Sequence, residues 1–126
     1  MDTEYVMLKD WTAMATELSA DLRTLRAGAP DVMKGFSALA QAALKADALD
    51  TRTKELIALA VSVATRCDGC IAFHAEAALK QGASRAEVLE TMGMAIYMGA
   101  GPSVMYAAQA LEAFDQVSAR AAAQAA

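Results

Sequence analysis

Residues 56–84 read LIALAVSVATRCDGCIAFHAEAALKQGAS, and this stretch decides the fold. Its first part continues a helix that Asp50 or Thr51 can cap, and it is apolar on almost every side from Leu56 to Ala64. Such a helix belongs in the middle of a core or of an assembly. A further helix is predicted to begin around Cys67 or Asp68 and to end at Gln81–Gly82. Two helices joined by a short turn are therefore expected here.

Helical signals continue on both sides of this stretch. A first helix is predicted from about Lys9 to Arg26, and Pro30 fits the first position of a second. The capping box at Ser84–Glu87 opens a fifth helix, and the Gly99–Pro102 break ends it and begins a sixth. Alanine is abundant, only two prolines occur, and no segment has the pattern of a good strand. The prediction is an all-α fold, a compact bundle of about six helices in one domain, 1–126.

Composition excludes several classes of protein. The chain is 56% hydrophobic and 21% charged with a net charge of −4, which excludes disorder and argues against a nucleic-acid partner. Residues 1–10, MDTEYVMLKD, have neither the basic nor the apolar region of a secretory signal. We therefore expect a cytoplasmic protein, in which two cysteines favour redox or metal chemistry over a structural disulfide.

The uncharged run at 91–111, TMGMAIYMGAGPSVMYAAQAL, is long enough to span a bilayer. The Gly99–Pro102 break divides it, and polar and small residues dilute its apolarity. We interpret it as buried core or subunit interface rather than a membrane helix. Because its methionines suit irregular interfaces, we predict an obligate oligomer, with core packing as the alternative.

Both cysteines and the single histidine of the chain lie within residues 67–74. On a helix at ~100° per residue, Cys67, Cys70 and His74 fall within a wedge of roughly 60°. Cys67 would lie at or just before the first turn, where backbone N–H groups and the helix dipole favour a thiolate. The C-x-x-C spacing also allows the two sulfurs to close into a disulfide.

This cluster could also be structural, or it could bind a metal. Buried cysteines are often inert, and a lone histidine on an apolar face is usually a core residue. A zinc site would use the same three side chains, but a fourth ligand would have to be Glu55, a water or another subunit. The clustering favours a functional redox pair, and we expect no metal and no bound cofactor.

Glu55 is a candidate partner for His74. If the two helices form an antiparallel hairpin that turns near Arg66, Glu55 lies ~16 Å below the turn and His74 about 10 Å. Contact therefore depends on side-chain length and helix crossing. The alternative is that Glu55 only favours the positive end of its own helix.

Glu55, the CDGC motif and His74 together resemble the alkylhydroperoxidase D core of the carboxymuconolactone decarboxylase superfamily. The family pattern is a Glu, a C-x-x-C twelve residues on, and a His four after the second Cys, and all four positions match. The resemblance covers roughly residues 30–115. It implies an all-helical fold, assembly into homo-trimers or homo-hexamers, and a thiol-dependent hydroperoxidase activity.

The resemblance also implies roles for these residues. Cys70 would be the attacking thiol and Cys67 the resolving thiol, with His74 as the proton relay and Glu55 orienting His74. The oxidised pair would need an external dithiol, such as a lipoamide-type or thioredoxin-like donor. Because Cys67 lies nearer the helix start, a reversed assignment stays open.

One position departs from the family pattern. Better-known members have a second His directly before the second cysteine, where this chain has Gly69. The departure puts efficient peroxide turnover in doubt and leaves room for a general disulfide reductase. A non-catalytic redox-sensing or structural oligomer is also compatible with the pattern. A decarboxylase-like member fits less well, because that branch of the superfamily does not use a C-x-x-C pair.

Overall fold

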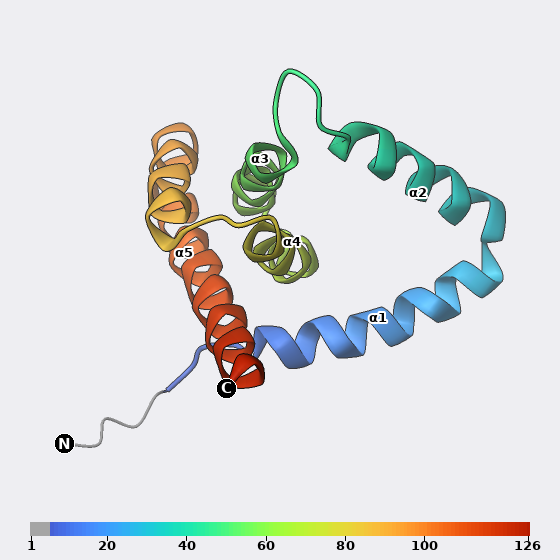
Figure 1. Cartoon of the computed structure of the whole chain (residues 1–126), viewed down its shortest axis with the longest axis horizontal. Coiled ribbons are helices and arrows are strands. Elements are labelled where there is room, and N and C mark those ends of the chain that lie inside the picture. Colours follow the sequence, from blue (N-terminus) through green and yellow to red (C-terminus); the bar gives the residue numbers. More distant parts are fainter. Residues whose placement is uncertain (1–5) are drawn as a thin grey trace.

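The computed structural model describes residues 6–126, and within this range it contains helices and no strand (Figure 1). The all-α prediction is confirmed. The helical elements are α1 (Trp11–Gly28), α2 (Pro30–Leu44), α3 (Thr51–Ala64), α4 (Asp68–Lys80) and α5 (Arg85–Ala125).

Side-chain caps fix where the helices begin. Asp50 caps α3 by accepting a hydrogen bond from the Thr53 N–H, and Pro30 is the first residue of α2. Ser84 and Glu87 form the predicted capping box of α5. The first helix begins at Trp11 and not at Lys9, because the Asp10 side chain accepts from the Ala13 N–H and caps the helix there.

A kink at Ala100 divides α5 into two helices. Ala100 has φ 56° and ψ −143°, in a region that L-residues rarely adopt, and Pro102 follows. Proline lacks an N–H, and its ring clashes with the carbonyl four residues earlier, so a regular helix cannot continue through this point. The predicted break between a fifth and a sixth helix is therefore present, although the ribbon is continuous.

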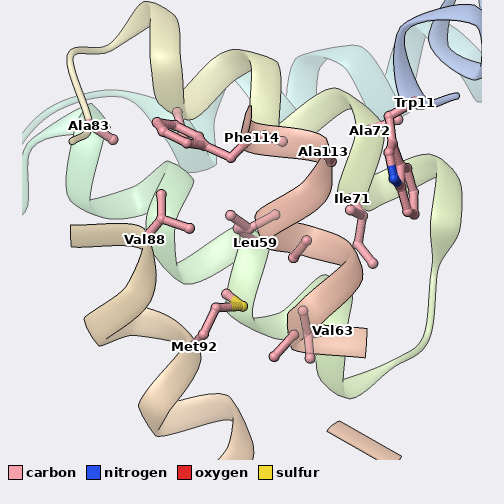
Figure 2. Packing of buried hydrophobic residues seen from close by; sticks show 14 of the residues in the cluster. Trp11, Leu59, Val63, Ile71, Ala72, Ala83, Val88, Met92, Ala113 and Phe114 are labelled. Carbon is pink, nitrogen blue, oxygen red and sulfur yellow. The ribbon is translucent and has the colours of Figure 1, made fainter. Parts of the chain in front are cut away.

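The core lies where α3, α4 and α5 meet. In Figure 1 α3 and α4 lie side by side with α5 along them, and α1 passes α4 on its other side. Figure 2 shows Leu59 and Val63 of α3, Ile71 of α4 and Val88 and Phe114 of α5 in one cluster, all at most 2% exposed. Many other core positions are alanine, whose small side chain lets the helices approach closely.

α2 lies away from this core. It forms the far corner of the open arrangement in Figure 1 and contains no buried residue. Its Val32, Phe36 and Leu39 side chains are 72%, 62% and 64% exposed. The apolar stripe of an amphipathic helix normally packs against another surface. Within residues 6–126 no surface covers these three side chains.

The uncharged run at 91–111 is partly core and partly surface. Met92, Ala95 and Ala107 are buried, whereas Tyr97 and Met98 are 79% and 77% exposed. In the part of the chain that the structure describes, no helix is both long and apolar enough to cross a membrane.

Candidate thiol redox site

Cys67 and Cys70 form a disulfide at the start of α4, with their Cα atoms 5.2 Å apart. Cys67 is the N-cap residue, and its extended backbone leaves the helix to begin at Asp68. Its Sγ accepts a hydrogen bond from the Cys70 backbone N–H at 3.2 Å. A sulfur in this position receives a free amide and the positive end of the helix dipole, which are the two features that stabilise a thiolate.

Glu55 and His74 are in direct contact. Glu55 Oε1 lies 2.7 Å from His74 Nδ1. The glutamate is 5% exposed, whereas the His74 side chain keeps 32% of its surface exposed. A carboxylate can only accept, so Nδ1 donates and Nε2 remains available to accept a proton. The contact that spacing alone left undecided is therefore present.

The core fixes the register of this pair. Leu59, one turn after Glu55, and Ile71 and Ala75, on either side of His74, are all completely buried between the helices. Figure 2 shows Leu59 and Ile71 within the same apolar cluster. Buried side chains pack at crystal-like density, so α3 cannot slide along α4 without leaving voids. The packing holds the carboxylate against the imidazole.

An apolar groove of about 350 Å³ adjoins His74. Its α2 wall is Ala40, Ala43 and Leu44, and its α3 wall includes Ile57 and Ala58. Lys54 also lines it, and its Nζ donates to the carbonyl oxygens of Ala43 and Lys45 at 2.9 and 2.6 Å. Lysine thus ties the end of α2 to α3, and the groove gives His74 an apolar approach.

Gly69 of α4 lies close to Leu18 of α1. A Cβ atom added at Gly69 would lie 2.6 Å from Leu18 Cδ2, closer than carbon atoms can approach. The end of the Leu18 side chain thus occupies the space next to Gly69. A side chain at 69 would require Leu18 to move.

The N-terminal segment reaches the same end of α4. Lys9 Nζ lies 2.6 Å from Asp68 Oδ2, next to Cys67. The segment is held on α5 by Glu112, which accepts from the Leu8 N–H at 2.7 Å and from the Trp11 indole N–H at 2.8 Å. Sequence reasoning missed Lys9, because no local pattern links residues 59 positions apart.

Glu112 is electrostatically adapted to this role. Burial alone would raise the pKa of its carboxyl. The hydrogen bonds from Leu8, Trp11 and Lys9 and the Lys9 charge outweigh burial and lower that pKa below its ordinary value of 4.5. The ionised form of Glu112 is therefore the one that holds the segment.

Among residues 6–126 no group of three or more His, Cys, Asp or Glu side chains is arranged to hold a metal ion. The four residues singled out from the sequence lie on the paired helices α3 and α4 and on the turn that joins them. They form a C-x-x-C disulfide and, one turn along α4 from Cys70, a carboxylate–imidazole pair.

Comparison with known proteins identifies the relatives of this chain. The model of the carboxymuconolactone decarboxylase family matches residues 30–113. An uncharacterized protein of Cupriavidus necator is 36% identical over 113 residues, covering 90% of this chain and 100% of the relative. An uncharacterized protein of Haemophilus influenzae is 42% identical over 108 residues, covering 86% and 96%.

Two solved structures are similar to this one. A carboxymuconolactone decarboxylase family protein of Legionella pneumophila has a TM-score of 0.84 and 53% identity, covering 86% of this chain and 96% of its own. A family protein of Thermotoga maritima, with a suggested involvement in an antioxidative response, has a TM-score of 0.74 and 27% identity, covering 82% and 89%.

Proposed function

Because this chain belongs to the carboxymuconolactone decarboxylase family and carries a C-x-x-C pair, we propose that it is a thiol-dependent hydroperoxide reductase. The observation that supports this most strongly is the 2.7 Å contact between Glu55 and His74, one turn from Cys70 on the same helix. An imidazole oriented by a buried carboxylate is a suitable general base for a nearby thiol.

In this mechanism His74 Nε2 accepts the proton of the Cys70 thiol, directly or through a water. The thiolate attacks the terminal oxygen of the hydroperoxide, the O–O bond breaks, and an alcohol leaves after taking up that proton. A sulfenic acid remains on Cys70. The Cys67 sulfur then attacks Cys70, water is released, and the disulfide forms.

An external dithiol completes the cycle. Thiol–disulfide exchange returns both cysteines to thiols and oxidises the donor, so no bound cofactor takes part. A lipoamide-type or thioredoxin-like donor has the required chemistry. The apolar groove beside His74 is an approach for the organic part of a hydroperoxide.

The test is a single-turnover reaction with an organic hydroperoxide, with mass spectrometry to locate the oxidised sulfur. Cys70→Ser should abolish the reaction. Cys67→Ser should consume about one equivalent and leave a trappable sulfenic acid on Cys70. Sulfenic acid on Cys67 in the Cys70→Ser protein, at the wild-type rate, would reverse the assignment. Stoichiometric oxidation without turnover in the presence of a dithiol donor would instead support a redox sensor.

Disulfide reduction is the second candidate function. Position 69, where better-known members of the family have a second histidine, is glycine in this chain. Reduction of a disulfide substrate needs a nucleophilic thiol and a resolving thiol but no proton delivery to a peroxide oxygen. Comparing turnover of a hydroperoxide and a small disulfide in one preparation separates the two activities.

We also propose that the protein works as a homo-oligomer, a trimer or a hexamer. The isolated chain has an accessible surface of 8102 Å² at 13.2 kDa, whereas a compact monomer of this mass has roughly 6,400 Å². The apolar side chains of α2 and Tyr97 and Met98 of α5 are part of this surface. Large exposed apolar areas are typical of subunit interfaces.

A further inference from the structure

Asp68 places a negative charge within the C-x-x-C motif. It follows Cys67 and precedes Cys70 by two residues, and it is the first residue of α4. A carboxylate beside a thiol disfavours the thiolate, which is the nucleophile in peroxide reduction and in disulfide exchange. Without a positive charge nearby, Asp68 would therefore counteract the stabilisation of a thiolate by the helix dipole.

Lys9 is positioned to offset that charge. Its ammonium nitrogen lies 2.6 Å from Asp68 Oδ2, and the two side chains are 31% and 32% exposed. Partial burial weakens the screening of the pair by solvent and salt. The pair therefore presents little net charge to the two sulfurs.

The position of Lys9 does not depend on the ion pair. Its backbone N–H donates to Glu112 Oε1 at 3.1 Å, and its carbonyl oxygen accepts from Gln116 Nε2 at 2.7 Å. The ammonium group also lies 5.4 Å from the Trp11 ring centre and 5.5 Å from that of Tyr106. Removing the charge of Lys9 should thus leave the segment in place.

We propose that Lys9 is a positioning residue of the redox pair, which acts through Asp68 to maintain the reactivity of the Cys67–Cys70 thiols. The proposal rests on the C-x-x-C pair being the reactive group, as in the proposed function. The disulfide form carries no charge on sulfur, so the effect appears in the reduced protein.

Other titratable groups lie around the same helix. Glu55 of α3 and His74 of α4 bond to each other, and Tyr106 and Glu112 of α5 lie near Lys9. Arg66 precedes Cys67 and is exposed. The α1 residue that approaches Gly69, Leu18, is apolar and carries no charge. The Asp68 carboxylate bonds to Lys9.

The test is the alkylation rate of the fully reduced protein by iodoacetamide at pH 7, with mass spectrometry to locate the modified sulfur. Iodoacetamide is neutral, so its rate reports the thiolate and not electrostatic attraction of the reagent. Lys9→Met should react about two- to tenfold more slowly than wild type, and Asp68→Asn faster by a similar factor. Lys9→Met/Asp68→Asn should return to near the wild-type rate, and Lys9→Arg should keep it.

An effect of charge predicts that the two single substitutions change the alkylation rate in opposite directions and that the double variant restores it. A structural defect caused by Lys9→Met would not be repaired by Asp68→Asn. Equal rates in wild type, Lys9→Met and Asp68→Asn would overturn the proposal, as would Lys9→Arg reacting as slowly as Lys9→Met. If Lys9→Met fails to fold, Asp68→Asn decides alone, and an unchanged rate refutes the idea. Alkylation needs no hydroperoxide, so absent peroxide turnover would refute the proposed function and leave this inference standing.

Discussion

At the scale of single residues, the proposed function depends most on the Glu55–His74 contact. Glu55 is buried among apolar side chains, where an unpaired carboxylate would be costly. Its hydrogen bond to Nδ1 both satisfies the carboxylate and leaves Nε2 as the acceptor. The contact therefore stabilises the buried carboxylate and, in the proposed mechanism, orients the base for proton transfer.

Replacing His74 should separate these two roles. We expect His74→Gln to form the disulfide but to slow the single-turnover attack on hydroperoxide by about 10²- to 10⁴-fold, because the thiol loses its base. Glu55→Gln should act in the same direction but more weakly. Stopped-flow kinetics at pH 7 measures both.

Glu76→Gln is the matched control for these variants. Glu76 is on the same helix, two residues beyond His74, and pairs with Lys80 instead. Its reaction should proceed at the wild-type rate. Undiminished turnover in His74→Gln would remove the proton relay from the mechanism.

The sequence predicts part of this site and not the rest. Helical periodicity predicts that Cys70 and His74 share a face of α4, and Cys67 caps the start of the same helix. It leaves Glu55 undecided, because distance along two helix axes does not specify how the helices cross. Lys9 and Leu18 carry no local signal, since each reaches α4 only through the tertiary fold.

At the scale of helices, local signals decide the boundaries and distant contacts decide the arrangement. Asp50, Pro30 and the Ser84 capping box act within one turn, so the sequence predicts the starts of α2, α3 and α5. The attachment of Leu8 to Glu112 spans 104 residues and has no such signal. The sequence does not predict the position of α2 either, because its apolar stripe packs against no other part of residues 6–126.

The attachment of the N-terminal segment should be acid-sensitive. Because the pKa of Glu112 in the folded protein lies below 4.5, its stabilisation is complete above pH 4.5 and is lost as the pH falls through the lowered value. We expect the melting temperature of wild type to exceed that of Glu112→Gln by about 2–5 °C above pH 5. Below pH 4.5 the difference should shrink towards zero.

Melting curves between about pH 3 and 7 measure this difference. The other carboxylates are the same in both proteins, so their titration does not contribute to it. Glu90→Gln is the control, since Glu90 is exposed on α5 before the kink and does not contact residues 8–11 in any hydrogen bond or ion pair described above. It should show no pH-dependent difference from wild type. A constant gap between wild type and Glu112→Gln down to about pH 3 would contradict the assignment.

At the scale of the whole molecule, the exposed apolar stripe of α2 is the main reason to expect an assembly. α2 contributes nothing to the buried core, and its Phe36 is 62% exposed. An apolar stripe in water adds no stability to a monomer, whereas burying the same stripe in a subunit interface is favourable.

Charge on this stripe should therefore disrupt assembly. We expect wild type to scatter light as a multiple of 13.2 kDa at micromolar concentration, and Phe36→Asp to shift towards the monomer. Lys34→Glu is the control, because Lys34 lies about 160° from Phe36 around the helix. A wild-type monomer at micromolar concentration would refute the oligomer.

The attachment of residues 8–11 to α5 also has a consequence for the order in which parts of the chain fold during synthesis. Glu112 and Gln116 leave the ribosome more than a hundred residues after Leu8, so residues 8–11 cannot attach until that part of α5 has been synthesised. By then α3 and α4, which are close in the chain, can already have paired. A nascent or C-terminally truncated chain would thus carry the cysteines with Asp68 still unneutralised by Lys9. If the inference about Lys9 is right, the cysteines reach their full reactivity only after residues 8–11 have attached to α5.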